Sequence, residues 1–374
     1  MEEVQDTDTL SPEVLACWIA LSRVSGIGPV GFRALLDYFD EDVEAAWNAG
    51  RVELSRAGIG RRVIENLLSL RTTLNPQAEL ERLQKLRMNV LTWKDRLYPP
   101  LLREVNDAPP TLYLYGKLTE ADRFALAVVG TRNSSTYGQQ VTQRMVTELA
   151  KGEVTIVSGL ALGIDTIAHT AALDAGGRTI AVLASGLDII YPPDNRKLAH
   201  RIVESGQGVL VSEYPPGLQP DGKNFPARNR IISGLALGVL VVEAPERSGA
   251  LITAGFALKQ GRDVFAIPGS ILSSRSAGVN KLIQDGAHSV MSVRDIIEAL
   301  NLFMIPHQIE MQAVLPDNAE EKQLLDLLSH DPLHIDDLIR ESDLPTHDVI
   351  AVLTMMELKG MIKQVGSMQY MLAR

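Results

Sequence analysis

An octapeptide from Lys223 to Arg230 contains the residues of this sequence best suited to binding a phosphate-rich ligand. It reads KNFPARNR and combines three cations, two asparagines and one aromatic ring at a predicted helix start. Cations can follow a nucleic-acid backbone while a ring stacks on a base, so this mixture is typical of single-stranded nucleic-acid binding. Arg228 and Arg230 would point about 200° apart on a helix, so they cannot both face one ligand. One of them could instead pair with Glu213 or Glu243, which end neighbouring predicted strands.

Two loops that follow apolar runs could also approach a phosphate. In the first loop, Gly130-Thr131-Arg132 leads through hydroxyl side chains to a predicted helix start. Backbone N–H groups at a helix N-terminus and a planar guanidinium both bind phosphate well. In the second loop, Ser158-Gly159 opens a run of small residues along which a ligand can approach the backbone. Neither loop carries G-x-G-x-x-G, and the sequence has no P-loop, so no nucleotide cofactor is expected.

Ser158, Asp165 and His169 suggest hydrolase chemistry as an alternative use of the second loop. Asp165 and His169 lie at i and i+4 on the helix predicted to follow it. No G-x-S-x-G elbow accompanies them, so we favour structural roles, in which Asp165 caps the helix and His169 packs. No further His or Cys lies near them in the sequence, and Cys17 is the single cysteine. We therefore expect neither a metal site nor a disulfide framework.

These loops belong to a segment, residues 111–304, in which seven short apolar runs alternate with helix-length stretches. The runs occupy residues 111–116, 125–130, 154–159, 179–186, 208–213, 238–244 and 263–269. Their hydrophobicity is continuous rather than alternating, which indicates strands buried on both faces of a parallel sheet. The segment therefore predicts an α/β fold with an extended Rossmann-like, doubly wound and mostly parallel sheet. The carboxyl ends of such strands line a ligand crevice.

Residues 1–110 are expected to form an all-α domain of the helix-hairpin-helix or SAM-like kind. Gly-Ile-Gly turns at residues 26–28 and 58–60 each stand between helical stretches. The exposed amides of such turns could hold a DNA phosphate. The alternative is that the turns merely connect helices in a small bundle, and the few basic residues near the first turn favour it.

A C-terminal domain is expected at residues 319–374, after a proline-containing linker at residues 305–318. Three helical segments followed by a short hairpin predict a winged helix. The third helix should be the one that reads DNA, but residues 345–359 contain one Lys, no Arg and two acids. Contact with a protein is therefore favoured over reading of a DNA groove.

The net charge of −10 does not exclude nucleic acid, because the charge is unevenly distributed. Residues 1–110 carry −4 and residues 319–374 carry −5, whereas residues 123–299 carry +2. A local basic surface matters more for polyanion binding than the overall sum. No apolar run reaches the roughly 18 residues of a membrane span, and the acidic start lacks the basic region of a signal peptide. We expect a cytoplasmic protein without membrane association.

The α/β segment resembles the DNA-processing protein A (DprA/Smf) family, in order, from residue 98 to residue 287. The motifs that carry the resemblance are YPPLLREVNDAPPTLYLYG (98–116), VVGTRNSSTYG (128–138), VSGLALGIDTIAH (157–169), TIAVLASGLDIIYPPDN (179–195), SEYPPG (212–217), FPARNRIISGLA (225–236), VVEAPERSGALITAGFALKQGRDVFAIPG (241–269) and GVNKLIQDGA (278–287). A match of this length is far more specific than any single loop.

The resemblance implies a cytoplasmic homodimer that binds single-stranded DNA, without cofactor, metal or covalent chemistry. Members of the family protect incoming strands during bacterial natural transformation and help to load the RecA recombinase onto them. The positions that match the family's DNA-binding loops are Gly130, Thr131, Arg132, Ser158, Gly159, Phe225, Arg228 and Asn229, with Lys223 and Arg230 beside them. The resemblance places the dimer contact at Leu282 and Ile283, on a short predicted helix.

A nucleotide phosphoribohydrolase is the enzymatic alternative, because such enzymes have related Rossmann-like folds. They use the motif P-G-G-x-G-T-x-x-E around an acid. At the comparable strand end this chain reads EAPERSGA from Glu243, so it keeps an acid but lacks the motif. We expect the Glu243 carboxylate to order the crevice loops rather than to act as a general base.

Overall fold

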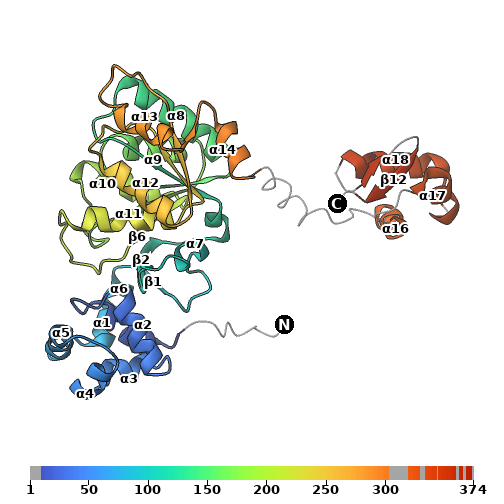
Figure 1. Ribbon diagram of the computed structural model, residues 1–374. Helices are drawn as coiled ribbons and strands as arrows, with labels where there is room; N and C mark the ends of the chain where they lie inside the picture. Colours follow the sequence, from blue (N-terminus) through green and yellow to red (C-terminus); the bar gives the residue numbers. More distant parts are fainter. Residues whose placement is uncertain are drawn as a thin grey trace. The chain divides into compact units, whose positions relative to one another are not determined.

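The computed structural model describes residues 10–302, 319–328, 333–342, 344–358, 362–364 and 368–372. The chain forms two compact units, Met1–Leu300 and Asn301–Arg374 (Figure 1). The expected helical and α/β domains both lie in the first unit, and the expected winged helix lies in the second. The expected linker at residues 305–318 falls outside the described residues.

A nine-stranded sheet forms the centre of the first unit. Its strands are β1 (Asn89–Thr92), β2 (Thr111–Gly116), β3 (Ala125–Val129), β4 (Thr155–Ser158), β5 (Thr179–Val182), β6 (Gly208–Ser212), β7 (Gly238–Val241), β8 (Asp263–Ala266) and β9 (His288–Ser289). The order across the sheet is β1-β2-β6-β5-β4-β3-β7-β8-β9. The seven strands β6-β5-β4-β3-β7-β8-β9 all run parallel to one another, and β1 and β2 form an antiparallel edge. All seven apolar runs are strands, so the predicted mostly parallel fold is confirmed.

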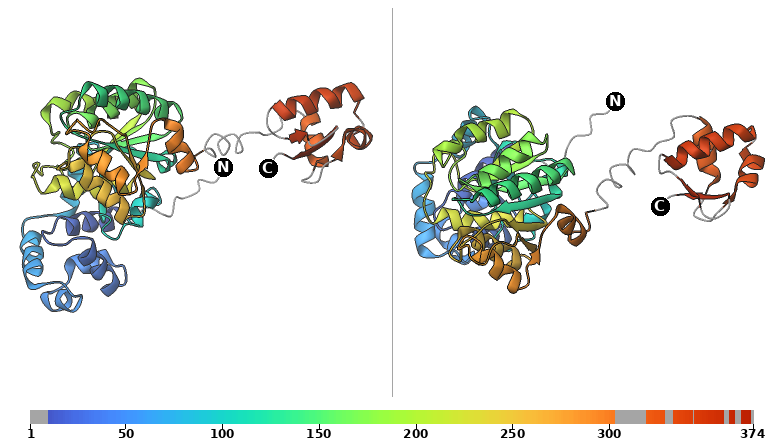
Figure 2. Two further views of the ribbon diagram at one scale, coloured as in Figure 1. Left: turned by 45° about the horizontal axis from the view of Figure 1, so that its top comes forward. Right: turned by 90° about the horizontal axis from the view of Figure 1, so that it is seen from above.

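Helices cover both faces of this sheet, with α8 to α10 on one side and α11 to α13 on the other (Figure 2). The helical elements of this part are α7 (Pro100–Arg103), η1 (Glu120–Arg123), α8 (Thr136–Lys151), α9 (Ile164–Asp174), η2 (Pro193–Asn195), α10 (Arg196–Glu204), α11 (Asn224–Gly234), α12 (Gly249–Lys259), α13 (Ala277–Gln284) and α14 (Val293–Ala299). Helices on both faces make this a doubly wound sheet, as a parallel arrangement requires.

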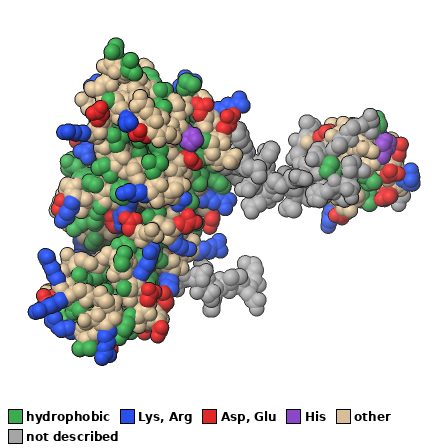
Figure 3. All heavy atoms as spheres, in the orientation of Figure 1, with side chains coloured by type: hydrophobic (Ala, Val, Ile, Leu, Met, Phe, Trp, Pro, Cys, Tyr) green, Lys and Arg blue, Asp and Glu red, His purple; other side chains and the backbone are tan. Residues whose placement is uncertain are grey.

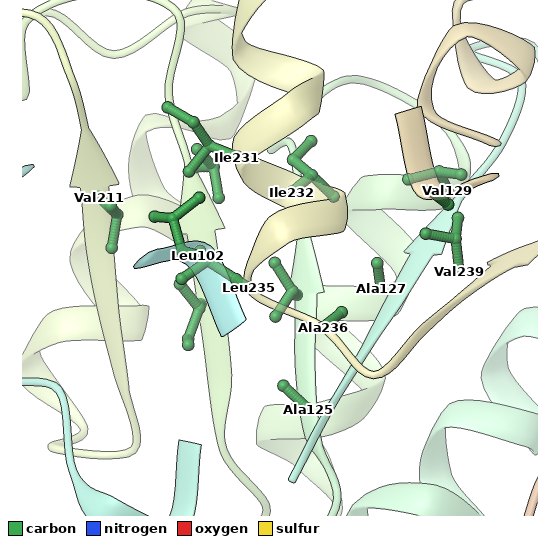
Figure 4. Close-up of a cluster of buried hydrophobic side chains, with 14 of the residues drawn as sticks. Leu102, Ala125, Ala127, Val129, Val211, Ile231, Ile232, Leu235, Ala236 and Val239 are labelled. Carbon is green, nitrogen blue, oxygen red and sulfur yellow. The ribbon is translucent and has the colours of Figure 1, made fainter. Parts of the chain in front are cut away.

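The core of this part lies between the sheet and its covering helices. Figure 4 shows Ile231 and Ile232 of α11 packed over the strand residues Ala127 and Val239. Leu126, which alternation directs to the opposite face of β3, is also completely buried. Both faces of the central strands are therefore removed from water, which explains the unbroken apolar runs in the sequence.

β3 is the point at which the strand order reverses. From β3 the chain adds β4, β5 and β6 on one side, whereas β7 and β8 lie on the other. Ligands of doubly wound sheets bind outside the carboxyl ends of the strands at such a point. The loops after β3, β4 and β7 must therefore flank the crevice.

Six helices precede the sheet in the part of the chain described from residue 10 onward. They are α1 (Pro12–Ser22), α2 (Pro29–Tyr38), α3 (Val43–Asn48), α4 (Arg51–Arg56), α5 (Arg61–Arg71) and α6 (Pro76–Lys85). Each Gly-Ile-Gly turn joins two of these helices, and Gly26 and Gly58 have φ values of 94° and 80°. This left-handed conformation favours glycine. Arg side chains gather over α4 and α5, around the second turn (Figure 3).

The helical part is anchored to the sheet, so the boundary expected at residue 110 is not a break in the structure. The ring of Trp18 in α1 lies 6.3 Å from the ring of Trp93, which follows β1. The Nε1 of Trp18 donates a hydrogen bond to the carbonyl of Pro110 at 2.8 Å. β1 lies within the segment expected to be wholly helical and pairs with β2. Its short run, Asn-Val-Leu-Thr, carries little pattern of its own, which is why sequence periodicity missed it.

The second unit is the predicted winged helix. Its described elements are α16 (Ala319–Leu327), β10 (Leu333–His334), α17 (Ile335–Ser342), α18 (Thr346–Leu358), β11 (Ile362–Gln364) and β12 (Gln369–Leu372). The strands form a sheet of order β10-β12-β11, and Leu338, Leu353 and Met356 are completely buried between the helices. Ile350 and Met355 are half exposed on α18, which carries acids but no Lys or Arg.

Candidate nucleic-acid interface

A pocket of about 570 Å³ opens where the strand order reverses. Its walls are the loop after β3, the first turns of α11, and the loop that leads from β7 into α12. Ala161 and Asp165, which follow β4, also line it. The Asn229 side chain donates to the carbonyl of Gly249 at 3.2 Å and so joins α11 to the start of α12. The pocket therefore occupies the crevice that the topology predicts.

The structure brings six of the predicted site residues together in this pocket. They are Gly130, Thr131, Arg132, Phe225, Arg228 and Asn229. Ser158 and Gly159 are buried at the end of β4 and do not line it. Lys223 is exposed in a neighbouring hollow, where its amino group pairs with Asp221 at 3.3 Å.

The first loop is held by the end of β7. The Thr131 N–H donates to the Glu243 carbonyl at 2.7 Å, and the Glu243 carboxylate accepts from the Ser135 N–H and hydroxyl at 2.9 and 2.5 Å. Glu243 is buried, so this carboxylate has the loop-ordering role expected for it. A Cβ at Gly138, in the first turn of α8, would lie 2.3 Å from a Glu243 oxygen, so a larger residue there would displace this carboxylate.

Arg132 projects from this ordered loop into solvent. Its side chain is exposed, and it makes no ion pair within the described residues. The guanidinium carbon lies 5.6 Å from the centre of the half-buried Phe225 ring. The site thus presents a cation resting on a ring, both at the wall of one pocket.

Arg228 forms part of the buried floor. Its Nη1 donates to the carbonyl of Gly159 at 2.8 Å and also to the carbonyl of Val182. Burial lowers the pKa of the Arg228 guanidinium to about 10, which still leaves it charged at pH 7. A Cβ at Gly159 would lie 2.6 Å from this guanidinium. Arg228 therefore contributes positive charge to the pocket while it fixes the ends of two strands.

Arg230 does not reach the pocket. Its guanidinium is 8% exposed and forms two 2.7 Å hydrogen bonds with the Glu213 carboxylate. It also lies 3.2 Å from the Asp107 carboxylate and donates to the Asp107 carbonyl. The sequence anticipated that one of the two arginines would pair with an acid, and Arg230 is the one that does.

The residues of the hydrolase alternative are not brought together as a catalytic group. The Ser158 hydroxyl donates to the Val128 carbonyl, while the Asp165 carboxylate accepts from the N–H groups of Gly159 and Ala161. The buried His169 ring contacts the Thr179 hydroxyl at 2.7 Å. Burial lowers the pKa of His169 to about 3, so its ring is neutral at pH 7. Each side chain has a structural partner of its own.

Arg247 and Ser248 line the pocket and were missed by the sequence reasoning. Arg247 is exposed without an ion pair inside the described part of the chain, and the Ser248 hydroxyl accepts from the Ala250 N–H at the start of α12. A signal for them existed. The loop after β7 repeats the pattern of the loop after β3, in which an Arg and a hydroxyl precede a helix that begins near a glycine.

Two kinds of feature are missing from the described residues. No group of three or more His, Cys, Asp or Glu side chains among them could hold a metal ion. None of the helices described is both long enough and apolar enough to cross a membrane.

An open pocket with several cations and one ring lies at the switch point of the sheet, and the fold is that of a Rossmann-like α/β protein. Residues 89–301 match the family described as DNA recombination-mediator protein A, and residues 310–367 match the DprA winged helix domain. The chain belongs to this DprA/Smf family of DNA-processing proteins.

Individual relatives agree with this assignment. Protein Smf of Synechocystis is 37% identical over 95% of this chain and 98% of its own. The X-ray structure of DNA processing protein A from Streptococcus pneumoniae has a TM-score of 0.67 and 38% identity, over 76% of this chain and 97% of that one. A structure of the Helicobacter pylori protein, described by its single-stranded DNA binding mode, has a TM-score of 0.52 and 32% identity, over 58% and 96%.

Proposed function

We propose that this protein binds single-stranded DNA in the pocket at the carboxyl ends of β3 and β7. The observation that carries the proposal is the exposed Arg132 guanidinium over the Phe225 ring, with Arg247 in the same pocket. A cation beside a ring suits a strand whose phosphates are charged and whose bases are unpaired. The Helicobacter pylori relative, which is described as binding single-stranded DNA, supports the same ligand.

The wider role that we propose is that of a recombination mediator in the cytoplasm. The protein would protect incoming single strands during bacterial natural transformation and help to load the RecA recombinase onto them, as the family resemblance implies. We propose no covalent reaction for it, and no cofactor. Binding of this kind needs a surface that positions the DNA backbone without reading sequence, which phosphate contacts provide.

The phosphoribohydrolase alternative would need a free carboxylate in the pocket. The Glu243 carboxylate already accepts two hydrogen bonds from Ser135, and this is why we do not favour it as a general base. Incubation with AMP distinguishes the two functions. We expect no adenine to be released, and release above a Glu243→Gln control would favour the enzyme.

Replacing Arg132 with alanine tests the proposed ligand. We expect affinity for single-stranded oligonucleotides to fall about 10-fold at low salt, equally for all sequences, because a charge-assisted phosphate contact is lost. The slope of log affinity against log salt should become shallower by about 0.7, as for one phosphate of a single strand. Gel shifts across a salt series, with single-stranded and duplex oligonucleotides, measure both quantities.

Lys151 supplies the matched control for this experiment. It is an exposed cation at the last turn of α8, whereas the pocket is lined by the loop that precedes that helix. Lys151→Ala should leave the salt slope unchanged. A normally folded Arg132→Ala protein with the wild-type slope would mean that Arg132 has a structural role only.

We further propose that the protein is a homodimer joined through α13. Leu282 and Ile283 pack against the core of their own sheet, where α13 contacts β8, but remain partly exposed. A two-fold contact between identical surfaces would place two strand-binding pockets in one particle, and linked sites gain avidity.

Ile283→Glu should convert this dimer into folded monomers. A charge at a partly exposed apolar contact opposes association but leaves most of the α13 packing in place. We expect affinity per site to persist, while higher-order nucleoprotein complexes and RecA loading decline. Light scattering measures the mass. If the Ile283→Glu protein stays dimeric at low micromolar concentration, the interface lies elsewhere. If the wild-type protein is itself a monomer, the proposal of a homodimer is wrong.

A further inference from the structure

A second aromatic ring, that of Tyr191, lies next to the Phe225 ring. Tyr191 is 44% exposed, and its ring centre is 5.5 Å from that of Phe225, with the planes tilted by 58°. Its hydroxyl makes no hydrogen bond to any residue that the structure describes. Tyr191 does not line the pocket itself, so it extends the aromatic surface beyond the pocket wall.

The segment that carries Tyr191 is fastened to the floor of the pocket. Asn195, four residues later, is buried, and its amide donates to the Leu160 carbonyl and to the Thr166 hydroxyl, each at 2.8 Å. A further bond of 3.2 Å reaches the carbonyl of Ala161, which lines the pocket. The second ring is therefore positioned by the same loop that shapes the pocket.

The helix that follows begins with two cations. Arg196 and Lys197 occupy the first turn of α10, are exposed, and form no ion pair within the described ranges. The first turn of α10 has neither an acid nor a side-chain cap, although Asp194 precedes it. Cations are unfavourable at the positive end of a helix dipole, so their position is not explained by the stability of α10. A bound anion would remove this repulsion.

We propose that the single-strand surface continues from the pocket across Phe225 to Tyr191 and on to the start of α10. Tyr191 would stack on a base, and Arg196 and Lys197 would hold the adjoining phosphates. The Cα atoms of Tyr191 and Arg196 can be at most about 18 Å apart, so ring and cations can serve one stretch of strand. This subsite rests on the proposed function, and it predicts that the protein distinguishes oligonucleotides by length.

The test is fluorescence anisotropy with labelled oligothymidylates of about 5 to 20 nucleotides, a range of known single-strand site sizes. For the longest, Tyr191→Ala should weaken binding roughly 5- to 100-fold, as expected for loss of one stacked base, and Tyr191→Trp should retain it. The shortest oligonucleotide that fills the pocket should bind both variants like the wild type. The double variant R196A/K197A should make the salt slope shallower by about 1.4 on the longest strand, since two phosphate contacts are lost.

Two controls match these changes. Tyr38, the last residue of α2, is 40% exposed, and its ring lies 4.9 Å from that of Phe39, so Tyr38→Ala removes a similar ring elsewhere. Lys151→Ala removes an exposed cation at the far end of α8. Neither control should change the length dependence. R196A/K197A alters solvent-exposed side chains only, so it provides a folded test even if Tyr191→Ala lowers the Tm.

The outcomes separate this subsite from the function on which it rests. If wild-type protein binds no oligonucleotide of any length, the proposed function itself fails. If Arg132→Ala weakens binding while Tyr191→Ala and R196A/K197A both bind the longest strand like the wild type, the extension alone is wrong. A loss of the same size on the shortest and longest strands would also overturn it, because the effect would then lie in the pocket.

Discussion

Replacing Arg230 with alanine is expected to lower the free energy of unfolding by about 3–5 kcal/mol. The Arg230 guanidinium is buried and bonds to both oxygens of Glu213, which is itself 17% exposed. Without it, the largely buried Glu213 carboxylate would lose the cation that bonds to both of its oxygens. Removal of one partner from a buried ion pair is costly for this reason, even where the intact pair adds little to stability.

Urea denaturation of the wild type and the Arg230→Ala variant measures this difference. Arg201→Ala is the matched control, because Arg201 pairs with Asp174 at a site where both side chains are about half exposed. Exposed pairs contribute about 0–1 kcal/mol, so this control should change stability little. At a temperature where Arg230→Ala remains folded, its affinity for single-stranded DNA should match the wild type. A stability loss below about 1 kcal/mol together with weak DNA binding would instead make Arg230 a DNA contact.

The central sheet could be predicted because each of its buried strands corresponds to one continuous stretch of sequence. A parallel strand with both faces buried needs an unbroken apolar run, and each of the seven runs became a strand. β1 and β9 lie at the two edges and have four and two residues. An edge strand this short needs no distinctive run, so its place depends on pairing with a distant strand. The attachment of the helices through Trp18 and Trp93 likewise depends on tertiary contact.

The candidate site was only partly predictable for a related reason. Local sequence identified the cations and the ring, but it could not tell which cation would meet a distant acid. Arg228 and Arg230 are both buried, and they differ in their partners, two backbone carbonyls in one case and the Glu213 carboxylate in the other. Arg247 was missed because its loop lies far along the chain, and the fold brings it back to the crevice.

Replacing Phe225 with alanine should weaken single-strand binding by about 1–3 kcal/mol, since a base-stacking ring is lost. Phe225→Trp should retain binding, because any large aromatic face can stack. Anisotropy with a short oligothymidylate measures the affinity, and thermal unfolding checks that the variant is folded. Normal DNA binding by folded Phe225→Ala, or unfolding of that variant, would mean that the ring has a structural role and that the stacking hypothesis is wrong.

The contact between Arg132 and Phe225 predicts that the effects of replacing these two residues depend on each other. Because the guanidinium rests 5.6 Å from the ring centre, the ring helps to hold it where a phosphate would bind. The two substitutions should therefore not be additive. In the Phe225→Ala background, Arg132→Ala should cost about 0.5–1 kcal/mol less than it does in the wild type. Strict additivity across this double-mutant cycle would mean that ring and cation bind the strand independently, and that their stacking does not organise the site.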